Sequence, residues 1–302
     1  MRRGVSVSLS TASYLFTLLI TCANANSVPY LQPGFSFDFV GSETTVALPV
    51  TAQCETISLK WSRKSTAKGP PPIAPYFLQV FSSSSPSPFS IPAGPGPTFD
   101  WQVPFAPQTQ YQICMYDIQG TSGGCRAIRT MVASSTPNVS CQNVTSLPQL
   151  SASTPTDDQS KPITQPRVIS QCSDFSVTPA AGTPPFTLTV APSRHPPVNI
   201  TSNGRDPIYW TVALGFPFFA SLTSSDGLSW SRGPLYVDGQ GPSDCLSPGA
   251  LPKGTFTGAT AGAGAGGLML GAGLGVPRYV PDCSAKTRQE PHSVNERSPI
   301  YL

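Results

Sequence analysis

The stretch AQCETISLKW, residues 52–61, places Ile57, Leu59 and Trp61 at every second position. Apolar side chains that recur with a period of two lie on one face of an extended chain, so the segment predicts a half-buried β-strand. The same alternation occurs in FSFDF (35–39), YQICM (111–115) and FTLTV (186–190). Turn sequences rich in Pro, Gly and Ser separate these segments, as in SSDG at 224–227. The pattern therefore predicts an all-β fold.

The composition points the same way. The chain has 35 Pro and 26 Gly, which interrupt helices, and only 11% of its residues are charged, too few for long amphipathic helices. The net charge of +3 is thinly spread. A basic cluster at Lys60, Arg63, Lys64 and Lys68 is not dense enough for a nucleic-acid footprint, so we expect no nucleic-acid partner.

The sequence also repeats itself. In its first half AQCETISLKW is followed by GPPPIAPYFLQV, DWQV and Cys125, and in its second half SQCSDFSVTP is followed by GTPPFTLTV, YWTV and Cys245. Cys54 and Cys125 are 71 residues apart (125 minus 54), and Cys172 and Cys245 are 73 apart (245 minus 172). Two copies of one fold, each closed by an equivalent disulfide, explain this agreement.

The remaining cysteines complete the predicted framework. Cys22 lies in the leader and Cys283 beyond a Gly-Ala stretch, which leaves Cys114 and Cys141 to pair with each other. Four cysteines in the first copy allow three connectivities, so this pairing stays open. In an exported chain these residues predict disulfides, and no C-x-x-C spacing supports a metal site.

Short strands, turn signals and a bridge across about 100 residues are typical of an immunoglobulin-like antiparallel β-sandwich. We therefore predict two such sandwiches in tandem, at residues 26–132 and 167–250. Trp61 has the expected place shortly after the first cysteine, but Pro179 stands there in the second copy, so the likeness is architectural.

The N-terminus has the order of a secretory signal peptide. Arg2 and Arg3 precede the apolar run YLFTLLI, and ANA ends at residue 25. We expect residues 1–25 to be removed on export, with an uncleaved signal anchor as the alternative.

A Ser, Thr and Pro-rich segment, residues 133–166, separates the two copies. Its composition predicts an extended, O-glycosylated spacer that does not fold and lets the modules move independently. N-x-S/T sequons at Asn138, Asn143 and Asn199 predict N-glycosylation.

The stretch GATAGAGAGGLMLGAGLGV contains a GxGxxG pattern at Gly262, Gly264 and Gly267. A loop precedes it where a dinucleotide fold needs a strand, which disfavours a nucleotide cradle. Residues 255–276 carry no charge and are long enough to span a membrane, and glycines four apart would allow a GxxxG homodimer. Basic residues after the span place the tail, residues 277–302, in the cytosol. The alternative is a flexible Gly-Ala tail.

Few motifs for chemistry stand out in the sequence. No H-E-x-x-H motif occurs, and His195, beside Pro196 and Pro197, is expected in an exposed loop. We therefore expect no catalytic residue, no cofactor and no metal. Aromatic residues could stack on sugars, although core packing is favoured for most of them: Trp61, Tyr76, Phe77, Trp210 and Trp230.

The run QCSDFSVTP with GTPPFTLTVAP and NIT, together with ALPKGTFTGATAGAGAGG, resembles a group of surface proteins of basidiomycete (mushroom-type) fungi. The resemblance implies a signal peptide, Cys-bridged β modules, one membrane span and a cytosolic tail, and it implies no catalytic residues. A fainter likeness connects one module to fungal Ser/Thr-rich wall glycoproteins involved in β-glucan assembly.

These features predict a non-catalytic, glycosylated, single-pass type I protein of the plasma membrane, with its N-terminus outside. Its modules would bind cell-wall glycans or surface proteins, for adhesion or sensing. A secreted wall protein without an anchor is the alternative, and an enzyme acting on wall polysaccharide is less favoured, since it needs two carboxylates in a cleft.

Overall fold

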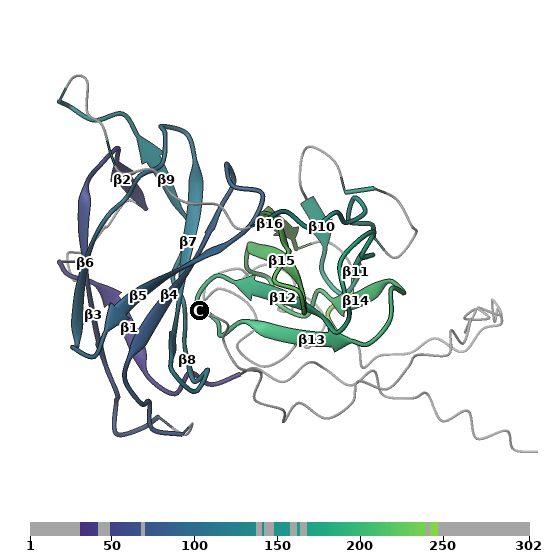
Figure 1. Cartoon of the computed structure of the whole chain (residues 1–302), viewed down its shortest axis with the longest axis horizontal. Coiled ribbons are helices and arrows are strands. Elements are labelled where there is room, and N and C mark those ends of the chain that lie inside the picture. The colour runs from purple at the N-terminus through teal and green to yellow at the C-terminus, as the bar shows by residue number, and fades with distance from the viewer. Residues whose placement is uncertain are drawn as a thin grey trace, which may run out of the picture.

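The strands of the chain follow its apolar alternation, and the computed structural model shows where they lie. It describes residues 31–41, 49–67, 70–136, 141, 148–157, 162–163, 168–239 and 242–246. These residues form sixteen β-strands and no helix, which confirms the all-β prediction. We call β1–β9 the N-terminal module, and β10–β16 with residues 148–157 the C-terminal module (Figure 1).

The N-terminal module contains two sheets. Its strands are β1 (Ser36–Phe39), β2 (Val50–Ala52), β3 (Thr56–Ser62), β4 (Tyr76–Ser82), β5 (Phe89–Gly94), β6 (Thr98–Gln102), β7 (Gln110–Asp117), β8 (Ser122–Cys125) and β9 (Arg129–Val132). One sheet has the order β1-β3-β6, and the other has the order β2-β9-β7-β4-β5 with β8 paired to β7. The predicted rows from β3 and β7 are buried together between the sheets.

The C-terminal module is built in the same way. Its strands are β10 (Val168–Ser170), β11 (Asp174–Val177), β12 (Phe186–Pro192), β13 (Val198–Ser202), β14 (Ile208–Thr211), β15 (Phe218–Ser224) and β16 (Ser229–Asp238). A five-stranded sheet, β10-β16-β15-β12-β13, faces the pair β11-β14. Phe186, Leu188 and Val190 of β12 are fully buried in the core between them, as their alternation predicts.

Hydrogen bonds at equivalent places reproduce the sequence repeat. The N–H of Cys54 donates to the carbonyl of Val103 at 3.2 Å, and the N–H of Cys172 donates to the carbonyl of Val212 at 2.9 Å. Both cysteines have a positive φ, 63° and 60°. In each module a short strand also runs parallel to the last one, β2 beside β9 and β10 beside β16. The two halves therefore share local geometry as well as sequence.

The disulfides require a correction. Cys172 pairs with Cys245, the predicted partner, but Cys54 pairs with Cys141 and Cys114 with Cys125, in place of the predicted Cys54–Cys125 and Cys114–Cys141. The reason is β8, which has no counterpart among the described strands of the C-terminal module and which sets Cys125 directly opposite Cys114 of β7. The bridge equivalent to Cys172–Cys245 therefore ends at Cys141, after β9.

The predicted spacer also needs correction. Leu150 is fully buried in the C-terminal core, and Ile163 packs there too. Residues Ala152 and Thr156 form antiparallel bridges to Pro179 and Ser176, on and just after β11. Residues 152–156 therefore lie beside β11 in the C-terminal module, as β1 lies beside β3 in the N-terminal module. The C-terminal module thus begins near residue 148, and a spacer boundary at residue 166 is too late.

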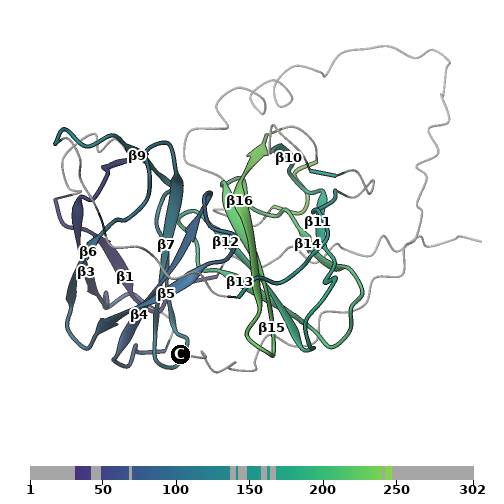
Figure 2. The ribbon, with the colours of Figure 1, turned by 45° about the horizontal axis from the view of Figure 1, so that its top comes forward.

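The modules touch. Phe81, Cys114 and Cys125 of the N-terminal module form one buried cluster with Ala191 and Phe219 of the C-terminal module. The two ring centroids of this cluster lie 5.9 Å apart. Figures 1 and 2 show β4 and β7 of one module beside β12 and β16 of the other. Independent movement of the modules, which the length of the spacer suggested, does not fit this contact.

Candidate functional site

The described residues contain no assembly typical of catalysis. No group of three or more His, Cys, Asp or Glu side chains is placed to hold a metal ion in that part of the chain. The expectation of an exposed His195 is wrong, because its side chain is 1% exposed. Its Nε2 accepts a hydrogen bond from the N–H of Leu31, and its carbonyl accepts one from the N–H of Cys125. His195 therefore belongs to the contact between the modules.

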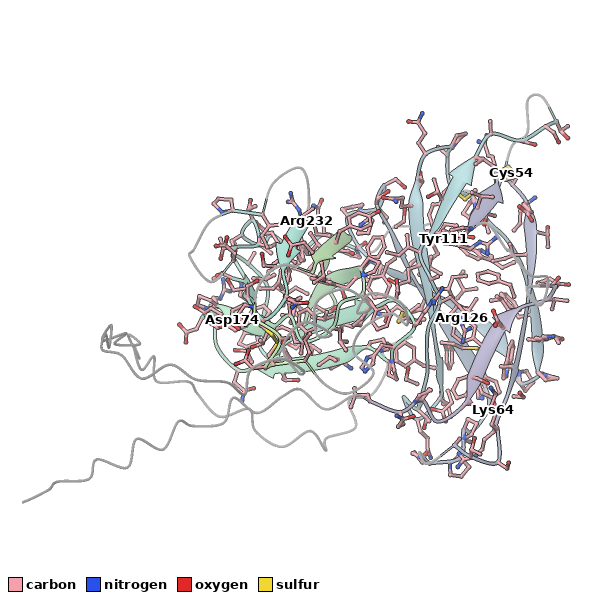
Figure 3. All side chains as sticks on the ribbon, turned by 180° about the vertical axis from the view of Figure 1, so that it is seen from behind. Cys54, Lys64, Tyr111, Arg126, Asp174 and Arg232 are labelled. Carbon is pink, nitrogen blue, oxygen red and sulfur yellow. A yellow bond between two sulfur atoms is a disulfide. The ribbon has the colours of Figure 1, made fainter. Side chains whose placement is uncertain are left out.

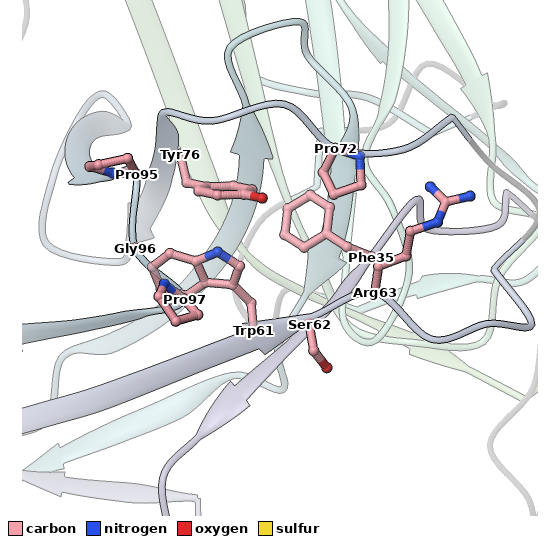
Figure 4. Close-up of a pocket in the computed structure, with 9 residues that line it drawn as sticks. All are labelled: Phe35, Trp61, Ser62, Arg63, Pro72, Tyr76, Pro95, Gly96 and Pro97. Atoms are coloured by element: carbon pink, nitrogen blue, oxygen red, sulfur yellow. The ribbon is translucent and has the colours of Figure 1, made fainter.

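A pocket opens at one end of the N-terminal module. It has a volume of about 210 Å³ and is lined by Phe35, Trp61, Ser62, Arg63, Pro72, Tyr76, Pro95, Gly96 and Pro97 (Figure 4). These residues come from the position just before β1, the end of β3 and the residue after it, the segment before β4 with its first residue, and the β5–β6 turn. Figure 3 shows Lys64, next to this pocket in the chain, at the end of the module opposite Cys54.

Aromatic rings form the inner walls. The Tyr76 ring lies edge-to-face with Trp61, with centroids 5.1 Å apart, and with Phe35, with centroids 5.5 Å apart. Edge-to-face pairs are favourable because the positive edge of one ring meets the negative face of the other. The three rings therefore stabilise one another and together form the inner wall of the pocket.

The indole nitrogen of Trp61 is one of the polar groups of the lining, beside the side chains of Ser62, Arg63 and Tyr76. It is buried, and no acceptor among the described residues lies within hydrogen-bonding distance. In Figure 4 it lies on the edge of the indole that faces the ring of Tyr76. A buried donor without an acceptor costs free energy, about 1–3 kcal/mol, which a ligand carbonyl or hydroxyl would recover.

Asp117 fixes the loop that carries the proline wall. Its buried carboxylate accepts hydrogen bonds from the N–H groups of Ile73 at 2.7 Å, Gln119 at 2.9 Å and Thr121 at 2.7 Å. The segment before β4 is thereby tied to the β7–β8 turn. Ile73, which follows Pro72, stays 46% exposed, and Ile118, whose N–H donates to the carbonyl of Ile73, is 41% exposed. Two exposed isoleucines therefore stand together, one of them next in the chain to the pocket-lining Pro72.

The sequence drew attention to two of the lining residues, Trp61 and Tyr76, and missed the rest. Phe35 was expected only as one of a buried row, and the proline walls were treated as turns. The missed signal is the pair of proline clusters, PPP at 70–72 and PGP at 95–97, placed at the same end of neighbouring strands. Of the other aromatic candidates, Phe77, Trp210 and Trp230 are buried in or against the cores, as the core-packing alternative expects.

Asn199 lies on β13, the last strand of its sheet, with an exposed side chain. The hydroxyl of Thr189 donates to its Oδ1 at 2.8 Å. The sequon threonine, Thr201, is two residues away and is exposed on the same face. The predicted sequons at Asn138 and Asn143 lie outside the described residues.

Residues 1–25, 255–276 and 277–302 also lie outside the described residues, so the predicted signal peptide, span and tail stay predictions. Within the part of the chain that the structure describes, no helix is long and apolar enough to cross a bilayer.

No family model and no curated protein matches the chain. Among solved structures, a two-domain fibronectin type-III segment of chicken tenascin is 16% identical, with a TM-score of 0.23, and the match covers 67% of this chain and 95% of that one. Domains FN1–FN3 of chicken CNTN1 are 10% identical, with a TM-score of 0.22 and coverages of 70% and 63%.

A third solved structure is SGBP-B of the Bacteroides ovatus mixed-linkage glucan utilization locus, in complex with a mixed-linkage heptasaccharide. It is 12% identical, with a TM-score of 0.21, and the match covers 67% of this chain and 47% of that one. At these values the likeness carries no statement about a ligand of this chain.

Proposed function

We propose that the chain is an exported, non-catalytic, glycosylated surface protein that binds a ligand in the pocket around Trp61. Its two modules are tandem sandwiches of immunoglobulin-like type, and residues 255–276 anchor it as a type I membrane protein facing a fungal cell wall. The resemblance to basidiomycete surface proteins belongs to this proposal. Three disulfides support export, because such bonds persist in oxidising compartments.

The observation that carries the binding role is the pocket with its unsatisfied donor. Convergent aromatic walls with a few polar groups are typical of binding sites. The nine lining residues include no Asp, Glu, His or Cys, so the pocket lacks the acid and base that glycoside hydrolysis uses. Binding without turnover is the function that this set of side chains supports.

The binding test compares wild type with Trp61→Phe, which keeps an aromatic ring and removes the donor. We expect wild-type protein to sediment with fungal wall fragments, and the variant to be retained several-fold less. Thermal unfolding of both proteins checks that the variant is folded. Equal retention of the two folded proteins would remove the pocket from the proposed function.

The anchoring test uses the full chain with a C-terminal tag in a fungal host. Resistance of the tag to carbonate extraction, with protection from external protease, is the expected result. A tag found in the medium or in the wall would instead establish the secreted form, in which residues 255–276 are a flexible tail. The eight glycines and three threonines of this segment favour the secreted form, because both residue types insert into a membrane less readily than Leu or Ile.

A further inference from the structure

We propose that the pocket and the neighbouring surface of Ile73 and Ile118 dock an extended, proline-bearing peptide segment of another surface protein. This inference rests on the proposed binding function and names the class of ligand. A peptide of this kind would place one proline ring in the pocket and an apolar side chain on the two isoleucines.

The size and walls of the pocket suit a proline ring. Its volume of about 210 Å³ is below the roughly 300 Å³ at which pockets for drug-sized ligands begin, so it admits one small ring. Trp61, Tyr76 and Phe35 offer ring faces and edges, and three prolines complete the apolar wall. Aromatic-lined grooves recognise proline-rich segments because such segments are already extended and lose little entropy on binding.

The Trp61 nitrogen suits a peptide carbonyl. An N–H group set among aromatic rings can donate a hydrogen bond to one carbonyl oxygen of an extended chain, which has no internal hydrogen bonds of its own. The ring of Tyr76 is half-buried and stands at the start of β4, so a small rotation of this ring would open the nitrogen to the ligand.

The isoleucine surface favours a peptide over a sugar. Ile73 and Ile118 are both more than 40% exposed and are joined by a main-chain hydrogen bond of 3.2 Å. An aliphatic surface gains free energy by covering apolar side chains, whereas it leaves sugar hydroxyls without partners.

The polar groups of the pocket point the same way. A sugar ring presents hydroxyls around its edge, and each needs a partner when it is buried. The lining contains no carboxylate and no side-chain amide, and the guanidinium of Arg63 donates to the carbonyls of Gly34 and Ala67. A proline ring makes no such demand. The positive charge of Arg63 in the lining, and of the exposed Lys64 next to it in the chain, favours a peptide with an acidic residue beside its prolines.

The test is a titration of the full chain, produced in a fungal host, with a blocked synthetic peptide rich in Pro and Glu. A second peptide has alanine at each proline, and a third probe is a β-1,3-glucan oligosaccharide. Binding is followed by calorimetry and by tryptophan fluorescence. The variants are Trp61→Phe in the pocket, Ile73→Ser on the exposed surface, and Tyr209→Ser, an exposed residue of the C-terminal module, as the matched control.

We expect the proline peptide to bind at least about tenfold more tightly than its alanine version. Trp61→Phe should weaken it by about five- to tenfold, and Ile73→Ser by about three- to tenfold, while Tyr209→Ser leaves it unchanged. Ile73→Ser keeps the test decisive even if Trp61→Phe perturbs the fold, since Ile73 contributes little to the core.

Equal binding of the two peptides, or binding that neither pocket variant alters, would overturn the inference. Glucan binding that depends on Trp61, without peptide binding, would overturn the peptide as ligand and leave the binding function of the pocket intact. If the peptides, the glucan and the wall fragments all bind independently of Trp61 or do not bind, the binding function of the pocket and the peptide as its ligand are both wrong.

Discussion

The imidazole Nε2 of His195 accepts a hydrogen bond from the main-chain N–H of Leu31 at 3.0 Å. An acceptor at Nε2 requires a neutral ring with its proton on Nδ1, where the carbonyl of Pro196 receives it. The carbonyl of His195 also accepts the N–H of Cys125 from β8. One buried histidine thus links the N-terminal segment, β8 and the C-terminal module, and its bond to Leu31 requires a neutral ring.

The first prediction concerns acid. Burial lowers the pKa of His195 below its ordinary value of 6.5, and Arg126 and Arg194 already bring positive charge to this region. Above that value the ring is neutral in both the folded and unfolded chain, so it adds no pH dependence. As the pH falls below it, the unfolded chain binds a proton that the folded chain resists, and the free energy of unfolding drops by up to about 1.4 kcal/mol per pH unit.

His195→Gln removes this titration and keeps an amide oxygen as acceptor. Urea unfolding at about pH 7.5 and about pH 5 should therefore show a smaller loss of stability in the variant than in wild type. The comparison cancels the carboxylates, which both proteins share. Parallel pH curves for the two proteins would show that His195 does not protonate on unfolding.

The second prediction concerns the aromatic contact between the modules. Phe219 is fully buried against Phe81, and Phe219→Ala should lower stability by about 3–5 kcal/mol. Phe175→Ala is the matched control, because Phe175 is equally buried but lies inside the C-terminal core. Both variants weaken the C-terminal module, and only Phe219→Ala should loosen it from its neighbour. Small-angle scattering should then report a larger radius of gyration for Phe219→Ala alone. An unchanged radius would mean that residues other than Phe219 hold the two modules together.

Much of each module could be predicted from period-two alternation. Tyr111, Ile113 and Met115 form one buried row, and the cysteine and valine of each repeat, such as Cys54 and Val103, meet as hydrogen-bonded partners. Local alternation fixes which face of a strand meets the core, because a change of register would turn every apolar side chain to the solvent. The all-β fold and the rows of each core therefore follow from sequence.

The contact between modules was missed, although its signal is present. In β4 the apolar residues come in pairs, Phe77 with Leu78 and Val80 with Phe81, and β15 has Phe218 with Phe219. Neighbouring residues point to opposite faces, so such pairs mean that both faces of the strand are covered. The position of Trp61 beside Tyr76 and two proline clusters could not be predicted in the same way, because it depends on how separate loops meet at the end of the sandwich.

The third prediction tests the disulfides. Proteolysis without reduction, followed by mass spectrometry, should recover peptides joining Cys54 to Cys141 and Cys114 to Cys125. On a chain-entropy argument, loss of the bridge that spans 87 residues should cost about 4–5 kcal/mol, and loss of the bridge that spans 11 should cost about 3 kcal/mol. Cys54→Ser with Cys141→Ser, compared with wild type in urea, measures the larger value. A peptide joining Cys54 to Cys125 would restore the pairing that the repeat alone suggested.

The fourth prediction concerns Asn199. Its side chain is exposed on the last strand of a sheet, and an attached glycan would shield that edge from pairing with another chain. Asn199→Gln should increase the electrophoretic mobility of the secreted protein by the shift that the loss of one glycan causes. Endoglycosidase treatment of wild type should cause the same shift at this site.

Thr201→Ala is the matched variant, because it destroys the sequon while it keeps Asn199 and its hydrogen bond from Thr189. Both variants should lose the same glycan, and Thr201→Ser should keep it. If the edge needs the glycan, the two glycan-free variants should aggregate on concentration while Thr201→Ser stays monodisperse. Identical mobility of all four proteins would mean that Asn199 is not modified, and β13 must then be protected by its short length and polar face alone.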